Sequence, residues 1–149
     1  MSDLRPTAPW GTGTGASPVG TVARSLLLID DDSMVGRFIG HAAEECGYRA
    51  TRTTGIESFR HQLRAGAPDA VALDLRIPGS DGIEIIRFLA EESYRGLVIV
   101  ISGLEQRLVH AAVRLGEAMG LHMADPLQKP FRSEELARLL ADAGAGEPR

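Results

Sequence analysis

The sequence predicts an α/β protein in which helices cover both faces of a parallel sheet. Five short apolar runs alternate with five segments whose apolar residues recur at helical spacing, a pattern typical of successive βα units. The runs that begin at Leu26, Ala70 and Leu97 are apolar at consecutive positions, as central strands are when helices lie on both sides. With 149 residues, the chain has the length of one domain.

Each short apolar run is interpreted as one strand of the sheet. The expected strands are Ser25 to Asp30, Tyr48 to Thr53, Ala70 to Asp74, Leu97 to Ser102 and His122 to Gln128. The last of these contains Pro126, which interrupts the run because its nitrogen carries no hydrogen for the sheet ladder. In such sheets the functional site lies beyond the carboxyl ends of the strands, where the strand order reverses.

The segments between the strands each have one apolar face. In chain order, these faces are Met34, Val35, Phe38, Ile39, Ala42 and Ala43; Ile56, Phe59 and Leu63; Ile83, Ile85, Ile86, Phe88 and Leu89; and Leu108, Val109, Ala112, Val113 and Leu115. The fourth helix is expected to extend through Met119. The fifth is expected from Ser133 to Ala143, with Ser133 as its N-cap and Gly144 beyond its end.

The chain is expected to divide into a disordered tail over residues 1–23, one domain over residues 24–143 and a short C-terminal tail over residues 144–149. The first 23 residues combine prolines and glycines with few large side chains. Such a segment buries too little side-chain area to offset the entropy lost when it becomes ordered.

The composition argues against several classes of function. A net charge of −4 disfavours a general nucleic-acid-binding protein. The apolar runs are far shorter than the roughly 20 residues of a membrane span, and residues 1–23 lack the apolar and basic regions of a secretory signal. The single cysteine, Cys46, has no partner for a disulfide within the chain. We therefore expect a cytoplasmic protein that contacts neither a membrane nor nucleic acid directly.

Carboxylates gather where two of the strands end. Asp30, Asp31 and Asp32 follow the first strand, and Asp74 ends the third. If these strands are neighbours, the like charges repel one another unless a cation lies among them. Oxygen-only clusters of this kind suit Mg²⁺ or Mn²⁺. The alternative is that the aspartates cap helices or form turns; Asp32 directly precedes a helix and is assigned to capping, whereas Asp30 and Asp31 are assigned to the metal.

Two further strand ends carry polar groups suited to an anion. The fourth strand ends in Ser102, followed by Gly103, and the fifth is followed by Lys129, the only lysine among 16 basic residues. A lysine in so arginine-rich a chain favours a site that needs a compact ammonium, the alternative being a chance surface position. With a metal on Asp30 and Asp31, and with Ser102 and Lys129 facing an anion, the pattern predicts phosphoryl transfer onto Asp74.

This set of motifs resembles the receiver domain of bacterial two-component response regulators. The matching segments are the LLLIDDD opening, the LDLRIPGSDGIE segment around Asp74, Ser102-Gly103, and Lys129-Pro130-Phe131, within a match from about Ser25 to Ala143. The resemblance implies a flavodoxin-like fold with a five-stranded parallel sheet of order 2-1-3-4-5. It also implies a regulatory phosphoacceptor that catalyses only its own phosphorylation and dephosphorylation.

The resemblance also assigns roles to single residues. Asp74 would accept phosphate from a histidine kinase or a phosphotransfer protein. Asp31 and Asp74 would bind Mg²⁺ directly, with the backbone carbonyl of Arg76 as a third ligand, and Asp30 would act largely through water. Ser102 would hydrogen-bond the phosphoryl group, and Lys129 would pair with it. The segment from Pro78 to Gly82 matches the turn after the acceptor, where Gly79 and Gly82 relieve the backbone.

The chain departs from the family pattern at two places. Pro126 stands three residues before Lys129, where the family usually has an aromatic residue whose rotamer follows the hydroxyl, so the switch would consist of Ser102 with Pro126 in the aromatic position. The stretch from Ser102 to Lys129 is about one helical turn longer than usual, and in this it is similar to receivers attached to EAL-type cyclic-di-GMP phosphodiesterase domains. Arg76 is expected to alter the lifetime of the phosphoryl group.

Phosphorylation is expected to change the surface of the fourth helix, fifth strand and fifth helix. The partner would be a separate chain: a kinase, a phosphotransfer protein, an output protein or a second copy of this chain. Two alternatives remain. A phosphohydrolase of the haloacid-dehalogenase type would need an aspartate where Arg76 stands. A receiver-like scaffold that is never phosphorylated is favoured by Pro126 alone.

Overall fold

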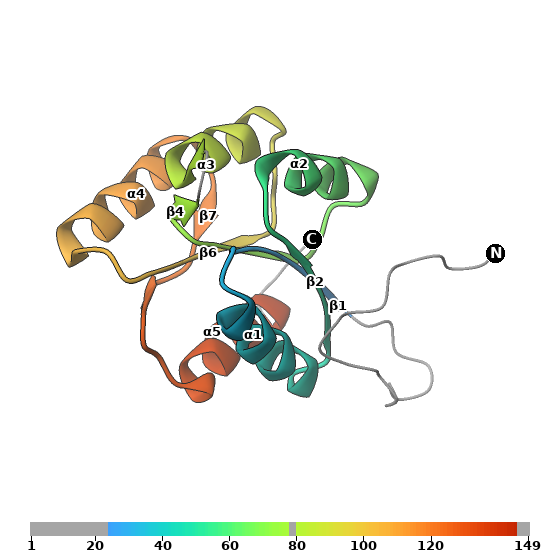
Figure 1. Cartoon of the computed structure of the whole chain (residues 1–149). Helices are drawn as coiled ribbons and strands as arrows, with labels where there is room; N and C mark the ends of the chain where they lie inside the picture. The colour runs from blue at the N-terminus through green and yellow to red at the C-terminus, as the bar shows by residue number, and fades with distance from the viewer. Residues whose placement is uncertain (1–23, 78–79, 146–149) are drawn as a thin grey trace.

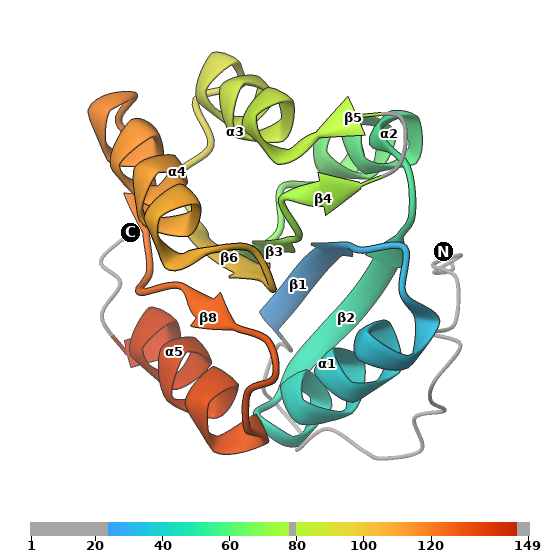
Figure 2. The same ribbon diagram turned by 60° about the vertical axis from the view of Figure 1, so that its left-hand side comes forward.

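A parallel sheet forms the centre of the molecule in the computed structural model, which describes residues 24–77 and 80–145. Its strands are β1 (Arg24–Ile29), β2 (Tyr48–Thr53), β3 (Ala70–Leu73), β6 (Leu97–Ser102), β7 (His122–Met123) and β8 (Leu127–Gln128). The order is β2-β1-β3-β6-β7, with β8 pairing with β6 (Figures 1 and 2). This order confirms the expected flavodoxin-like sheet, since β6 is the fourth of the five expected strands and β7 is the first part of the fifth. The expected disordered tail over residues 1–23, Pro78, Gly79 and residues 146–149 of the expected C-terminal tail lie outside the described residues.

The strand register brings the first polar residues after β1 and β3 to one edge of the sheet. Ile29 of β1 lies opposite Thr53 of β2 and Leu73 of β3. The ladder continues for one more residue on each strand: the N–H of Asp30 donates to the carbonyl oxygen of Thr53 at 3.1 Å, and that of Asp74 to Ile29 at 3.1 Å. Asp30 and Asp74 therefore emerge from neighbouring strands at the same level.

Helices cover the two faces of the sheet (Figure 1). They are α1 (Ser33–Glu45), α2 (Ile56–Ala65), α3 (Gly82–Glu91), α4 (Gln106–Ala118) and α5 (Ser133–Ala145). Helices α1 and α5 pack on one face and α2, α3 and α4 on the other. Within residues 24–77 and 80–145, the structure contains no helix with the length and apolarity needed to cross a bilayer.

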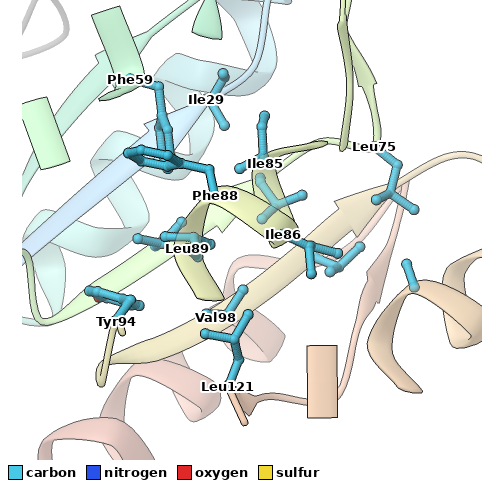
Figure 3. Close-up of a cluster of buried hydrophobic side chains, with 14 of the residues drawn as sticks. Ile29, Phe59, Leu75, Ile85, Ile86, Phe88, Leu89, Tyr94, Val98 and Leu121 are labelled. Atoms are coloured by element: carbon cyan, nitrogen blue, oxygen red, sulfur yellow. The ribbon is translucent and has the colours of Figure 1, made fainter. Parts of the chain in front are cut away.

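Each face of the sheet carries its own apolar core. Figure 3 draws the core beneath α2, α3 and α4, where the rings of Phe59 and Phe88 meet edge to face, with centroids 6.3 Å apart. On the opposite face, Ile39 of α1 and Leu136 of α5 are fully buried against the sheet. The central strands are buried on both faces, as their apolar runs predict.

The predicted apolar faces of α1 and α4 are wrong at three positions. Met34 and Phe38 of α1 are 76% and 41% exposed, and Leu108 of α4 is 54% exposed. In α1 the buried residues are Gly36, Ile39, Gly40, Ala42 and Ala43. The helix therefore packs through small residues, and its bulky Met34 and Phe38 side chains are left on the outer side.

The fifth strand and fifth helix differ from prediction in their bounds. The expected strand from His122 to Gln128 forms only as β7 and β8, because the segment around Pro126 leaves the sheet. Helix α5 begins at Ser133, so Arg132 rather than Ser133 takes the capping position, and its N–H donates to Glu135 Oε1 at 3.1 Å. The helix continues to Ala145, past the end predicted at Ala143.

A small antiparallel pair, which the sequence did not predict, follows β3. Strands β4 (Arg76–Ile77) and β5 (Ser80–Asp81) lie between β3 and α3 (Figure 2). Gly82 then approaches the chain closely, since a Cβ atom there would lie 2.6 Å from Leu75 Cα. The close approach, rather than a left-handed backbone, accounts for the glycine.

Candidate functional site

Lys129 joins two buried carboxylates at the carboxyl edge of the sheet. Its Nζ donates to Asp74 Oδ2 at 2.8 Å and to Asp30 Oδ2 at 3.3 Å. Asp30 and Asp74 are 1% and 6% exposed, whereas the Lys129 side chain is 22% exposed. One face of the ammonium group is thus directed at the carboxylates, and the group remains reachable from solvent.

The sheet itself places these three groups together. Asp30 and Asp74 directly follow neighbouring strands, and Lys129 follows β8, which pairs with the carboxyl end of β6. The N–H of Lys129 donates to the carbonyl oxygen of Ser102 at 3.0 Å. Residues that are up to 99 positions apart in the chain therefore meet at one edge because parallel strands end there.

Backbone N–H groups hold the remaining carboxylate oxygens. Asp30 Oδ1 accepts from the N–H of Asp32 at 2.9 Å, and Asp74 Oδ1 accepts from the N–H of Arg76 at 3.0 Å. Each oxygen has a second lone pair beyond the bond described. The carboxylates are therefore fixed in direction while they keep capacity for another partner.

Burial and charge act in opposite directions on the ionisable groups of this cluster. Burial raises the pKa of the Asp30 carboxyl, although the hydrogen bond from Asp32 and the charge of Lys129 partly oppose it. Burial also acts to lower the pKa of the Lys129 ammonium, but hydrogen bonds and charges from Asp74 and Asp30 outweigh it, and that pKa lies above its ordinary value. Lys129 is therefore a cation at neutral pH.

Ser102 lies fully buried at the end of β6. Its Oγ accepts from the N–H of Leu104 at 3.1 Å, and the carbonyl oxygen of Leu104 accepts from Gln128 Nε2 at 2.9 Å. Ser102 thus reaches the same edge as Asp74 and is connected through Leu104 to β8. Gly103, beside it, is exposed.

The other predicted site residues lie around this cluster. Asp31 is exposed next to Asp30, and the Arg76 side chain is exposed two residues after Asp74. Asp32 caps α1 as predicted, since its Oδ1 accepts from the N–H groups of Met34 and Val35 at 3.0 and 3.3 Å.

Pro126 lies between β7 and β8 and is half-buried. With Gln106, His110 and Pro130 it lines an open cleft of about 480 Å³ on the side of α4 and α5. The peptide bond between Lys129 and Pro130 is cis. Pro126 therefore lies at the surface of α4, β8 and α5, where the sequence predicts that partners bind. It precedes Lys129 by three residues.

The donor set at the edge fits a hard divalent cation. In residues 24–77 and 80–145, no three His, Cys, Asp or Glu side chains form a group that could hold a metal ion by themselves. Mg²⁺ needs only one or two carboxylates, because waters and phosphate oxygens complete its octahedron. The side chains of Asp30, Asp31 and Asp74 offer only carboxylate oxygens, which are the ligands that Mg²⁺ prefers. Asp31 is exposed, so a hydrated ion can reach it from solvent.

Sequence reasoning missed Arg52, at the carboxyl end of β2. Its Nε donates to the carbonyl oxygen of Asp30 at 3.2 Å, from a strand next to β1. A charged residue one position before the end of an otherwise strand-like segment was the available signal.

Comparison with known proteins places the chain in one family. Residues 26–141 match the sequence profile of the response regulator receiver domain. The transcriptional regulatory protein QseB of Escherichia coli O157:H7 is 32% identical over 118 residues, which cover 77% of this chain and 50% of QseB. The transcriptional regulatory protein FixJ of Azorhizobium caulinodans is 35% identical over 108 residues, which cover 70% of this chain and 47% of FixJ. The chain spans about half the length of these relatives.

Solved receiver structures are similar over most of the chain. The receiver domain of the Francisella response regulator 1452 has a TM-score of 0.68 at 25% identity, covering 81% of this chain and 97% of that one. The chemotaxis response regulator CheY4 of Vibrio cholerae shares the fold, with a TM-score of 0.69 at 17% identity and coverage of 82% and 99%. The chain therefore belongs to the response regulator receiver domain family.

Proposed function

We propose that this receiver accepts a phosphoryl group on Asp74 from a phosphohistidine of a histidine kinase or phosphotransfer protein. The observation that carries the proposal is the contact between Asp74, buried at the end of β3, and the single lysine of the chain at 2.8 Å. A carboxylate oxygen of Asp74 forms the new bond to phosphorus while the bond from phosphorus to the histidine nitrogen breaks. The bonding pair stays with that nitrogen.

The neighbouring groups supply charge and direction for the transfer. As negative charge builds up on the phosphoryl oxygens, Lys129 would pair with one of them. The Ser102 hydroxyl would donate a hydrogen bond to a second phosphoryl oxygen. Asp30, Asp31, Asp74 and the carbonyl of Arg76 would hold Mg²⁺ or Mn²⁺. When bound, the ion neutralises charge on the phosphoryl oxygens.

The proposed role is regulatory rather than that of an enzyme acting on a separate substrate. A phosphohydrolase of the aspartyl-phosphate type needs a second aspartate two residues after the nucleophile. Arg76 occupies that position here, and its side chain is exposed. We propose that Arg76 instead influences attack of water on the acyl phosphate, so Arg76→Ala should change the dephosphorylation rate; an unchanged rate would contradict this role.

The surface near the cluster supports docking of a phosphodonor protein. Met34 and Phe38 are exposed on α1, which begins directly after the Asp30–Asp32 loop. The Phe38 ring meets Phe131 edge to face at 5.5 Å, and Phe131 stands two residues after Lys129. An exposed apolar patch of this kind is suited to a protein partner. We propose that the donor contacts Met34 and Phe38.

The output of the switch would be read by a partner on α4, β8 and α5. The Ser102 hydroxyl accepts a hydrogen bond from the N–H of Leu104, and the carbonyl oxygen of Leu104 accepts one from the Gln128 side chain of β8. If the Ser102 hydroxyl moves toward a phosphoryl group, its bond to Leu104 is lost and the contact with Gln128 changes. These hydrogen bonds would connect Ser102 to the surface of α4, β8 and α5 in a receiver that has Pro126 where an aromatic residue is usual.

The mass of the intact protein after incubation with acetyl phosphate tests the proposal. We expect one added phosphoryl group that requires Mg²⁺ and that is absent in Asp74→Asn. Asp125→Asn is the matched control, since Asp125 is an exposed aspartate in the segment between β7 and β8. No mass gain in any condition would contradict the proposal and favour a scaffold that acts without phosphorylation.

A further inference from the structure

We infer that Arg52 is a positioning residue that orients the Asp30–Asp31 peptide, and that Gly36 is a glycine because the Arg52 side chain passes over it. The inference rests on the proposed function, since Asp31 is one of the proposed metal ligands. Arg52 itself would touch neither the metal nor the phosphoryl group. It acts on the backbone from which the Asp31 side chain projects.

The contact is made to the peptide between two proposed ligands. Arg52 Nε donates at 3.2 Å to the carbonyl oxygen of Asp30, which belongs to the peptide that joins Asp30 to Asp31. The Asp30 side chain is separately held by the N–H of Asp32 and by Lys129. Since a peptide group is planar, fixing its oxygen fixes the direction in which the chain enters Asp31.

Arg52 reaches this oxygen from the face of the sheet that α1 covers. It is paired in register with Leu28, whose side chain is buried in the core beneath α1 and α5. Strand β2 is the edge strand of the order described above, so the side chain can leave the sheet and extend to the Asp30–Asp32 loop. An arginine suits this contact because the planar guanidinium group fixes the direction of its Nε–H bond.

Gly36 makes the path available. A Cβ atom at position 36 would lie 2.5 Å from both Cδ and Nε of Arg52. Gly36 is buried in the first turns of α1, and its N–H donates to the carbonyl oxygen of Asp32 at 2.9 Å. A glycine inside a helix costs about 1 kcal/mol relative to alanine. Glycine at position 36 therefore makes α1 less stable than alanine would. The space that the Arg52 side chain needs is a physical reason for keeping glycine there.

The direct test is the affinity of the full chain for Mg²⁺ without any phosphodonor, measured by calorimetry. We expect Arg52→Ala to weaken binding by about tenfold, as does loss of other groups that orient metal ligands. Gly36→Ala should weaken binding similarly by pushing the Arg52 side chain aside. In the double variant, Gly36→Ala should add nothing to the effect of Arg52→Ala.

Two conservative variants separate backbone positioning from charge. The side-chain amide nitrogen of glutamine stands at the place of arginine Nε, so Arg52→Gln should keep Mg²⁺ affinity within about twofold of the wild type. Arg52→Lys keeps the charge but has a methylene at that place, so it should bind as weakly as Arg52→Ala. The opposite order, with lysine tolerated and glutamine not, would overturn the inference.

The thermal stability of Gly36→Ala distinguishes a glycine that makes room for Arg52 from one that only serves the packing of α1. Gly36→Ala should leave the midpoint of thermal unfolding unchanged or raise it, because alanine favours the helix and the displaced group is a flexible side chain. If Gly36→Ala instead lowers the unfolding midpoint and leaves Mg²⁺ affinity unchanged, the inference is wrong. Additive effects of Gly36→Ala and Arg52→Ala on affinity would also overturn it.

Failure of this inference can be told apart from failure of the proposed function. The chemical shift of the Asp31 backbone amide can be measured by NMR in the metal-free protein, and we expect Arg52→Ala to change it but Arg52→Gln to leave it nearly unchanged. If the wild type binds no Mg²⁺, the metal part of the proposed function fails, and this amide shift still decides the role of Arg52. An Asp31 amide that is unaffected by Arg52→Ala would contradict the inference.

Discussion

Lys129 Nζ lies 2.8 Å from Asp74 Oδ2 and bridges to the neighbouring Asp30 carboxylate at 3.3 Å. The two carboxylates leave adjacent strands, so without a cation between them two buried negative charges would face each other. The ammonium therefore lies between the two carboxylates in the unphosphorylated protein and is already in place for an anion bound to Asp74.

Removal of this lysine should destabilise the protein in a way that a cation reverses. We expect Lys129→Ala to lower the free energy of unfolding by about 1 to 3 kcal/mol, because Asp30 and Asp74 lose their partner. Added Mg²⁺ should restore more stability to Lys129→Ala than to the wild type. Urea unfolding with and without Mg²⁺ measures both effects, and a variant as stable as the wild type without Mg²⁺ would contradict the account.

Substitutions on the exposed side of α1 should separate two phosphodonors. We expect the double variant Met34→Gln, Phe38→Gln to be phosphorylated by acetyl phosphate at the wild-type rate, because these side chains are exposed and neither takes part in the proposed chemistry. Phosphorylation by a phosphohistidine protein active on the wild type should slow by about tenfold or more. Leu108→Gln, on the exposed side of α4, is the control and should transfer normally from both donors.

The hydrogen bond from Gln128 to Leu104 should transmit phosphorylation to the partner surface. In Gln128→Ala we expect the same yield of phosphoprotein as in the wild type but smaller changes in the backbone amide shifts of β8 and α5. NMR spectra recorded before and after addition of acetyl phosphate and Mg²⁺ measure the difference. Equal shift changes in Gln128→Ala and the wild type would remove this contact from the switch.

Tyr94 should make the fold sensitive to alkaline pH. Its hydroxyl donates to the carbonyl oxygen of Pro68 at 2.7 Å, and burial raises the pKa of Tyr94 above its ordinary value. The folded state therefore keeps the proton when the unfolded state loses it, and stability should fall as the pH rises above about 10. Tyr94→Phe should reduce this fall, yet cost about 1 to 3 kcal/mol at pH 7 by leaving the Pro68 carbonyl unpaired.

Urea unfolding of Tyr94→Phe and the wild type at several pH values between neutrality and pH 11 compares the slopes. Thr51→Val, at a half-buried position of β2 outside this contact, is a suitable control for a change in a single hydroxyl. Parallel pH dependence in Tyr94→Phe and the wild type would show that the Tyr94 hydroxyl does not titrate as its burial implies.

The sequence predicted the sheet because apolar runs and helical segments alternate, and because polar residues interrupt the pattern where strands end. Asp30, Asp74 and Lys129 could be found in this way, since parallel strands bring their carboxyl ends together. The exposure of Met34 and Phe38 could not. Periodicity treats bulky side chains as the buried face of α1, whereas Gly36 and Gly40 allow that helix to pack through its small residues.

The role of Arg52 also could not be predicted from local sequence, although a charge near the end of β2 marked the residue. Its contact with Asp30 joins residues 22 positions apart, and the contact depends on the absence of a side chain at Gly36. The split of the fifth strand lay closer to prediction, since Pro126 cannot donate to a ladder, but its two short pieces became visible only through their separate pairing with β6.

The most direct test of the central claim is to locate the phosphoryl group chemically. Borohydride reduction converts an aspartyl phosphate to homoserine, and peptide mass spectrometry then identifies the position. After incubation with acetyl phosphate and Mg²⁺, we expect homoserine at position 74 and unmodified aspartate at positions 30, 31 and 32. Homoserine at any of those three positions, or at none in a protein that remains folded, would contradict the assignment of Asp74 as the acceptor.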